Sequence, residues 1–187
     1  MKSKTEWELS PEGTTVIEQE AFRDCKDLTS ITIPDSVTEI GEDAFYGCTG
    51  LTSIVIGNSV TEIGDEAFSG CTGLTSIVIP DSVKTIGGWA FSDCAGLTTA
   101  SVLGPVKLMN GTFKDCTALE CVTLGAGIKK IIITDDDKEE ACAFGNCSAL
   151  KTINVPAKKA DYYKSRLPEE LHGLIVELPA EKKAKKK

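Results

Sequence analysis

The chain has 187 residues, of which 41% are hydrophobic and only 6% aromatic, so we expect one domain with an aliphatic core. Its net charge is −8 although five of its last six residues are lysines, so the rest of the chain is more acidic still. An acidic surface repels phosphate groups, which argues against nucleic-acid binding. No apolar run is long enough to span a bilayer, which argues against membrane insertion.

The N-terminal residues lack the pattern of an export signal. Residues 1–8 contain no hydrophobic stretch after their lysines, so the sequence favours a cytoplasmic protein. The cell surface or secretion is the alternative if the chain is a trimmed form. Residues 1–27 are assigned to an N-terminal cap and a partial repeat. We expect Trp7 and Leu9 to supply the apolar contacts of the cap, while residues 11–27 match the second half of a repeat.

The middle of the chain, residues 28–156, consists of internal repeats. Three units of 23 residues are nearly identical, a fourth lacks one residue, and a fifth has eight more between Ile131 and Phe144. A sixth begins as LKTINVP and then leaves the pattern. The units begin at Leu28, Leu51, Leu74, Leu97, Leu119 and Leu150.

Each unit begins with a strand pattern. In the first unit, Leu28, Ile31 and Ile33 are apolar, and polar Ser30 and Thr32 alternate with the two isoleucines, as expected for a half-buried strand. A Pro-Asp-Ser turn follows at residues 34–36.

The rest of the unit predicts a second, shorter inward segment. Val37 and Ile40 form an inward pair on a short extended stretch, and residues 42–45 predict a single helical turn with Ala44 and Phe45 facing inward. Because one unit buries little, the core must form between stacked units, with strands about 4.8 Å apart.

The repeated motif L-T-S-I-x-I-P-x-S-V-T-x-I-G-x-x-A-F-x-G-C-T-G closely resembles the BspA-like class of leucine-rich repeats, over residues 11–156. The resemblance implies a right-handed solenoid, or horseshoe, of short parallel strands stacked into a sheet, with short extended segments and single helical turns on the other sides. It also implies protein or surface binding. Many members are secreted or surface-anchored in bacteria, whereas this sequence shows neither an export signal nor an anchor.

The C-terminal segment, residues 157–179, is expected to cap the solenoid. We predict a helix and turn over residues 160–174, with an apolar face of Leu167, Leu171, Leu174 and Ile175. A helix that begins at Pro168 is one interpretation. A short strand at residues 174–176 that closes the sheet is the other. Residues 180–187 are interpreted as a disordered basic tail.

The insertion in the fifth unit is the most acidic stretch of the chain, at residues 134–140. We interpret it as a solvated loop. A contact site and a calcium loop are the alternatives, but the spacing does not match an EF-hand.

Most of the eight cysteines belong to the repeat. Six share one repeat position, and we expect them to stack as a column of free, buried thiols whose parallel side chains are poorly placed for disulfides. Cys121 and Cys142 lie outside this column, and Cys121 is expected to be an exposed thiol. The six are Cys25, Cys48, Cys71, Cys94, Cys116 and Cys147.

The sequence contains no recognisable catalytic motif. The single histidine, His172, lies in the C-terminal cap, and no glycine-rich segment has the residues of a phosphate loop. The acidic pairs recur with the unit, as surface residues do. We therefore expect neither an enzyme nor a cofactor or metal site. An unrecognised site around Cys121, Cys142 and the acidic insertion is the remaining route to catalysis.

Outward positions of the predicted sheet form a ladder of small, uncharged side chains, with Val55 and Val78 as an apolar spot at its centre. Repeat proteins commonly bind along such a strip, although Thr and Val are also simply good strand formers. Trp89 replaces an acidic residue of the preceding units and is predicted as an exposed anchor, unless it folds over Gly87 and Gly88. Tyr46 is a weaker candidate. The candidate partner-binding residues are Ser30, Thr32, Ser53, Val55, Ser76, Val78, Trp89, Thr99, Ser101 and Thr123.

Together these patterns predict a non-enzymatic module for protein–protein interaction or scaffolding. The partner is a protein whose identity, like the oligomeric state, the sequence does not specify. The alternative is a bacterial surface or secreted adhesin that binds host or matrix proteins.

Overall fold

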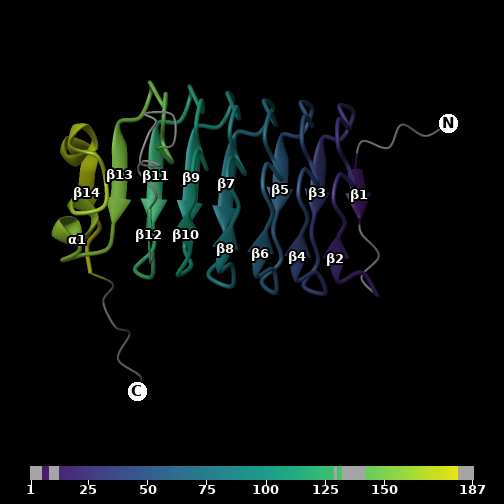
Figure 1. Ribbon diagram of the computed structural model, residues 1–187, viewed down its shortest axis with the longest axis horizontal. Coiled ribbons are helices and arrows are strands. Elements are labelled where there is room, and N and C mark those ends of the chain that lie inside the picture. Colours follow the sequence, from purple (N-terminus) through teal and green to yellow (C-terminus); the bar gives the residue numbers. More distant parts are fainter. Residues whose placement is uncertain (1–5, 9–12, 129, 132–141, 181–187) are drawn as a thin grey trace, which may run out of the picture.

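The protein is a β-solenoid in which each repeat forms one coil, as the sequence predicts. The computed structural model describes residues 6–8, 13–128, 130–131 and 142–180. The coils stack side by side in chain order, with the first and last labelled strands, β1 and β14, at opposite ends of the stack (Figure 1). We number the coils from the repeat units: coil 1 is residues 28–50, coil 2 is 51–73, coil 3 is 74–96, coil 4 is 97–118 and coil 5 is 119–149.

Every coil contributes one strand to each of two parallel faces. The front face, formed by the strand that opens each repeat, consists of β1 (Glu6–Glu8), β3 (Ser30–Thr32), β5 (Ser53–Val55), β7 (Ser76–Ile79), β9 (Thr99–Val102), β11 (Cys121–Leu124), β13 (Thr152–Val155) and β14 (Ile175–Glu177). The back face consists of β2 (Val16–Ile17), β4 (Glu39–Ile40), β6 (Glu62–Ile63), β8 (Thr85–Ile86), β10 (Lys107–Leu108) and β12 (Lys130–Ile131).

The back face is one continuous six-stranded sheet, whereas the front face is divided into two sheets. The front strands pair in the order β1-β3-β5 and, separately, β14-β13-β11-β9-β7. In Figure 1 the gap between the arrows of β5 and β7 is wider than the gap between β3 and β5 or between β7 and β9. The hydrogen bonding of the front face is therefore interrupted between coils 2 and 3.

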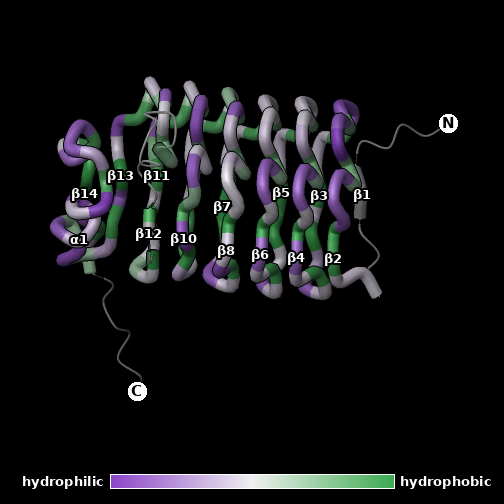
Figure 2. The backbone as a smooth tube through the Cα atoms, viewed as in Figure 1, coloured by the Kyte–Doolittle hydropathy of each residue, from purple (hydrophilic) through white to green (hydrophobic). Residues whose placement is uncertain are grey.

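The inward residues predicted from the repeat form the core. In coil 1 the predicted inward set, from Leu28 to Cys48, is at most 2% exposed, and the same positions are buried in coils 2 and 3 except Ile54, which is partly exposed. Figure 2 shows the result as hydrophobic stretches that recur at the same level of successive coils. Full burial of an aliphatic or aromatic side chain contributes about 1.5–3 kcal/mol, so this core is the main source of stability.

Phenylalanine rings form a continuous stack through the core. Neighbouring rings lie nearly parallel, with centroids 5.0 to 5.8 Å apart. The stack continues past the insertion in coil 5, because Phe144 stacks on Phe113 at 5.8 Å. The six rings are Phe22, Phe45, Phe68, Phe91, Phe113 and Phe144.

The predicted cysteine column lies beside these rings. All eight cysteines are free, and Cys48, Cys71, Cys94 and Cys116 are fully buried, whereas the column's end members are partly exposed. Five thiols of the column each donate a hydrogen bond to the main-chain carbonyl of a phenylalanine in the preceding coil: Cys48, Cys71, Cys94, Cys116 and Cys147. For example, Cys71 Sγ lies 3.2 Å from Phe45 O, and Cys94 Sγ lies 3.2 Å from Phe68 O. The column is thus a set of polar links between coils inside the core.

The helical turn predicted at residues 42–45 takes the form of tight turns. Asp43 has a left-handed φ of 55°, and alternate amides point to the next coil instead of along a helix. Asp43 N donates to Asp65 O at 3.0 Å, and Phe45 N donates to Ala67 O at 2.7 Å. A regular helix would direct these amides at its own carbonyls, so bonding between coils determines the conformation.

At the N-terminal end, β1 adds a strand to the front face. Its central residue, Trp7, pairs in register with Ile31. The cap contacts predicted for the side chains of Trp7 and Leu9 lie outside the described part of the chain. The acidic insertion at 134–140 and the basic tail from residue 181 onward also lie outside it.

The C-terminal segment closes the stack with two short helices and a strand. The helix and turn expected over residues 160–174 take the form of two short helices. The first, α1 (Ala160–Lys164), ends before Pro168, and a 3₁₀ helix, η2 (Glu169–Leu174), begins directly after this proline, which agrees with the interpretation of a helix that begins at Pro168. Proline lacks an amide donor and disfavours helix in the preceding residue, which explains the interruption. The alternative prediction of a closing strand is confirmed, because β14 pairs with β13.

Two tyrosines fasten this segment to coil 5. Tyr163 is fully buried, and its hydroxyl donates a hydrogen bond to Gly125 O. The Tyr162 hydroxyl donates to Ile128 O at 2.6 Å, and its ring is covered by the Arg166 guanidinium at 3.7 Å. These contacts satisfy main-chain carbonyls at the end of the stack.

We predict that Gly73→Ala destabilises the solenoid by about 1–3 kcal/mol, a typical overpacking cost. A Cβ at this position would lie 2.6 Å from Thr49 O in the preceding coil, and this oxygen is a main-chain atom that cannot rotate away as a flexible side chain could. Thermal unfolding should show a midpoint several degrees lower than that of the unmodified protein. Gly173→Ala is the matched control, since no atom lies within 4 Å of its Cβ position. Equal midpoints for the two variants would contradict close coil packing at Gly73.

We also predict that the free energy of unfolding falls as the pH rises from 9 towards 11. Burial raises the pKa of Cys48 from its ordinary value of 9.0 to about 11, and it raises the pKa of Cys71 still further. Unfolded thiols ionise first, so the thiol contribution is complete below pH 9 and is lost as the pH rises through the folded-state values.

Urea unfolding at pH 8 and pH 10.5 measures this effect. Removal of a buried thiol by Cys71→Ala should reduce the loss of stability between the two pH values, whereas removal of a partly exposed thiol by Cys121→Ala should leave it nearly unchanged. The same pH dependence in the unmodified protein and in Cys71→Ala would show that the buried thiol does not contribute.

Candidate interaction surface on the front face

The outward side chains of the front face lie in the two columns that the sequence predicts. Strand register places Ser30 beside Ser53, Ser76 beside Thr99, and Thr99 beside Cys121 in one column. The second column places Thr32 beside Val55, Val78 beside Ser101, and Ser101 beside Thr123. The structure thus brings nine of the ten candidate residues to one face of the stack, and their role in binding remains a prediction.

The centre of this face is apolar and hollow. Val55 and Val78 are each 56% exposed, and Leu103 is 45% exposed. They line a shallow depression of about 500 Å³, which we name the valine groove. Its lining consists of Ile54, Val55, Ile56, Asn58, Ser76, Val78, Pro80, Asp81 and Leu103.

The valine groove lies over the interruption between β5 and β7. Ile54 is partly exposed in it, whereas the equivalent residues of coils 1 and 3, Ile31 and Ile77, are each 2% exposed. The interruption therefore exposes core side chain in the middle of the face.

Sequence reasoning found the two valines of this groove but missed Leu103. This residue follows strand β9, at the position that holds Pro34 in coil 1 and Pro80 in coil 3. A large apolar residue in place of a turn proline was the available signal. It could be read only by comparing coil 4 with the regular units.

The C-terminal half of the ladder is polar, and its side chains bond to one another. Asn154 donates from Nδ2 to Cys121 Sγ at 3.3 Å and to Thr123 Oγ1 at 3.4 Å. Cys121 is partly exposed, so the prediction of an exposed thiol is confirmed only in part. This half offers a partner fewer free groups than the valine groove does.

Trp89 lies on the turn side of coil 3 and does not line the valine groove. It is 41% exposed and has a left-handed φ of 53°, a conformation shared by Asp43 and Glu66 at the same repeat position. Its ring lies against Gly111, where a Cβ would be 2.5 Å from Trp89 Cδ1. The alternative that Trp89 folds over Gly87 and Gly88 is therefore wrong, because the ring extends toward the next coil.

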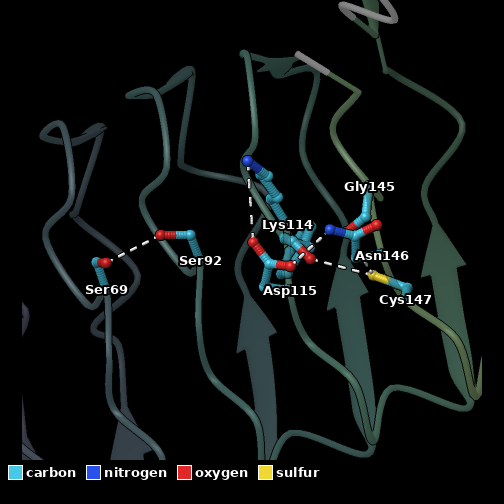
Figure 3. Close-up of polar contacts among 8 residues, drawn as sticks. Ser69, Ser92, Lys114, Asp115, Gly145, Asn146 and Cys147 are labelled. Atoms are coloured by element: carbon cyan, nitrogen blue, oxygen red, sulfur yellow. Dashed lines mark hydrogen bonds and ion pairs between the residues drawn. The ribbon is translucent and has the colours of Figure 1, made fainter. Parts of the chain in front are cut away.

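Polar side chains on the turn side link one coil to the next (Figure 3). Ser69 and Ser92 are buried and share a hydrogen bond of 2.9 Å. Asp115 accepts a hydrogen bond from Asn146 Nδ2 at 2.8 Å and lies 3.9 Å from Lys114 Nζ. These contacts stabilise the stack, so they account for the polar residues here without a ligand.

Tyr46 lies on the same side and is also engaged within the fold. The guanidinium of Arg23 lies 4.1 Å from the Tyr46 ring centroid and pairs with Asp43 at 2.5 Å. A ring already covered by a cation presents less surface to a partner, which supports its lower rank among the candidates.

The described residues offer little for catalysis. Burial raises the pKa of the Cys142 thiol, which disfavours the nucleophilic thiolate. His172 Nε2 lies 2.9 Å from Leu167 O, a contact within its own segment. Within the described ranges, no three His, Cys, Asp or Glu side chains gather as a metal site would require. No helix among the described residues is long and apolar enough to cross a membrane.

Comparison with known proteins agrees with this architecture. The BspA type leucine rich repeat region matches residues 15–134 in six copies. A leucine-rich repeat protein of T. pallidum is 29% identical with a TM-score of 0.66, and the match covers 88% of this chain and 76% of that one. No curated protein matches this chain.

Two other solved structures are similar but longer. A leucine-rich repeat protein of Eubacterium ventriosum is 32% identical, with a TM-score of 0.63, over 81% of this chain and 42% of that one. A leucine rich cell surface protein of Faecalibacterium prausnitzii is 27% identical, with a TM-score of 0.59, over 86% of this chain and 34% of that one. This chain therefore spans less than half the length of either protein.

The stacked coils, their aliphatic core and a family match over residues 15–134 lead to one conclusion. The chain belongs to the BspA-type leucine-rich repeat family.

Proposed function

We propose that this chain is a non-enzymatic protein–protein interaction module that binds its partner through the valine groove. The observation that carries the proposal is the cluster of Val55, Val78 and Leu103, all at least 45% exposed, around one depression. An exposed apolar cluster with a polar rim is typical of protein interaction sites.

Strand propensity alone is a weaker explanation of this cluster. It accounts for Val55 and Val78 as strand-forming residues, since Thr32 occupies the same position in coil 1. It does not account for Leu103, which follows a strand, or for the partial exposure of Ile54. A binding role accounts for all four residues.

The rest of the structure supports a scaffold that presents a surface. The predicted inward residues of coil 1 form part of a buried core, four thiols of the column are fully buried, and Ser69 and Ser92 bond between coils on the turn side. Three of the six exposed large hydrophobic side chains among the described residues line the valine groove.

A second candidate function is an adhesin at the bacterial surface. The F. prausnitzii relative, described as a cell surface protein, favours this candidate over the cytoplasmic scaffold. Protease shaving of intact cells distinguishes the two. Loss of the protein from shaved cells supports the adhesin, whereas full protection supports the internal scaffold.

We predict that the double variant Val55→Thr, Val78→Thr weakens partner binding by about 2–3 kcal/mol, since it makes two apolar contacts polar. Threonine keeps the β-branched shape, so the fold should persist. The matched control is Val176→Thr, an exposed valine on β14 at the far end of the same face, which pairs with Asn154.

Affinity capture from the source cells, with quantitative comparison of the three proteins, measures this prediction. Partners retained by the unmodified chain and by Val176→Thr should be depleted with the double variant. Equal capture by all three proteins would contradict binding through the valine groove.

A further inference from the structure

The interruption of the front face between coils 2 and 3 leaves main-chain groups unpaired. On either side of it, Thr52 N donates to Thr29 O at 2.9 Å and Thr98 N donates to Thr75 O at 2.9 Å. Among the described residues, the equivalent amide of Thr75 makes no such bond to Thr52. The threonine hydroxyls follow the same pattern, because those of Thr52 and Thr98 bond to the preceding coil.

The interruption is local to the front face. On the back face β6 and β8 remain paired, and Lys84 N donates to Thr61 O at 2.9 Å. On the turn side Phe68 N donates to Ala90 O at 2.8 Å. Coils 2 and 3 are therefore joined by main-chain hydrogen bonds on two sides, whereas β5 and β7 are not paired on the third.

The sequence of coil 2 differs from its neighbours at this point. Gly57 stands where coils 1 and 3 have Pro34 and Pro80, and a Cβ there would lie 2.7 Å from the carbonyl oxygens of Ile33 and Pro34. Coil 2 thus packs against coil 1 more closely than a proline would allow, on the side away from coil 3.

Unpaired main-chain groups beside an apolar groove match the needs of an extended peptide. Such a segment contributes its own main-chain donors and acceptors, and it places alternate side chains in neighbouring pockets. Ile54, Val55 and Val78 supply the apolar wall for an aliphatic side chain. The groove volume of about 500 Å³ is of the size that accommodates a few side chains.

The charge around the valine groove indicates which residue accompanies the aliphatic side chain in the bound peptide. Asp81 lines the groove, and Asp35 accepts a hydrogen bond from Asn58 N at 2.6 Å beside it. The lining includes no lysine or arginine, and the whole chain carries a net charge of −8. A cationic segment is therefore attracted and an acidic one repelled.

We propose that the valine groove takes an extended segment of a partner protein in which aliphatic residues flank a lysine or arginine. This inference rests on the proposed function and specifies the chemistry of the partner. In this proposal an aliphatic side chain of the partner contacts the apolar wall of the groove, and the lysine or arginine pairs with Asp81.

Fluorescence anisotropy with three labelled nine-residue peptides tests the proposal on the full chain. The first carries leucine–lysine–leucine at its centre, the second replaces the lysine by glutamate, and the third replaces both leucines by serine. We expect the first peptide to bind at least about tenfold more tightly than either of the others. Equal affinity for the lysine and glutamate peptides, or no binding of any peptide, would overturn the proposal.

Variants of the chain locate the binding. Val78→Thr should weaken the first peptide about tenfold, and Asp81→Asn should weaken it several-fold while reducing the salt dependence of binding. Val176→Thr is the control and should leave affinity unchanged, and thermal unfolding should show that all three variants remain folded. Unchanged affinity in both Val78→Thr and Asp81→Asn would also overturn the proposal.

Failure of this inference is distinct from failure of the proposed function. If no peptide binds while cellular partners are still lost from the double valine variant, the groove binds a folded surface and only the peptide proposal fails. If the valine variants keep both peptide binding and cellular partners, the groove itself is not the interaction site.

Discussion

The constant length of the repeat is the constraint on which the rest of the structure depends. A separation of 23 residues sets each side chain beside its own equivalent in the next coil, so every position becomes a column. Apolar columns form the core, phenylalanine rings stack at 5.0 Å, and main-chain amides bond across coils. The same rule has costs, because it places Glu39 directly beside Glu62 on the back face. Like charges in adjacent strands repel, and the buried core offsets that repulsion.

Departures from the regular repeat occur at positions where the coils can still stack. Coil 5 has eight more residues than a regular unit, yet Phe144 continues the ring stack on Phe113. Trp89 takes a left-handed position that costs an L-residue about 1–2 kcal/mol, and the neighbouring glycine at 111 leaves room for its ring. At Gly57 a Cβ would lie 2.7 Å from two carbonyl oxygens of coil 1, so coil 2 approaches coil 1 closely beside the exposed valines.

Much of this architecture could be predicted from the sequence because the same pattern of inward and outward residues recurs in each unit. The buried set, the two outward columns and the thiol column each appear in several units, so their patterns are not a chance feature of one unit. What the sequence did not reveal are singular features: the interruption between β5 and β7, the exposure of Leu103, and the direction of the Trp89 ring. The interruption and the direction of the ring depend on small displacements between coils, which local patterns do not encode, whereas Leu103 could be found only by comparing coil 4 with the regular units. The C-terminal segment was ambiguous for another reason, since one apolar spacing suited both a helix and the strand that forms.

The account of function depends on whether the front face is open between coils 2 and 3. Amide hydrogen exchange of Thr52, Thr75 and Thr98 in the native protein tests this most directly, because only the first and last donate to a preceding coil. We expect the Thr75 amide to exchange at least about tenfold faster than the other two, since no main-chain acceptor for it is found among the described residues. Equal protection at all three positions would show a continuous front sheet, and it would remove the structural basis for the valine groove as a peptide site.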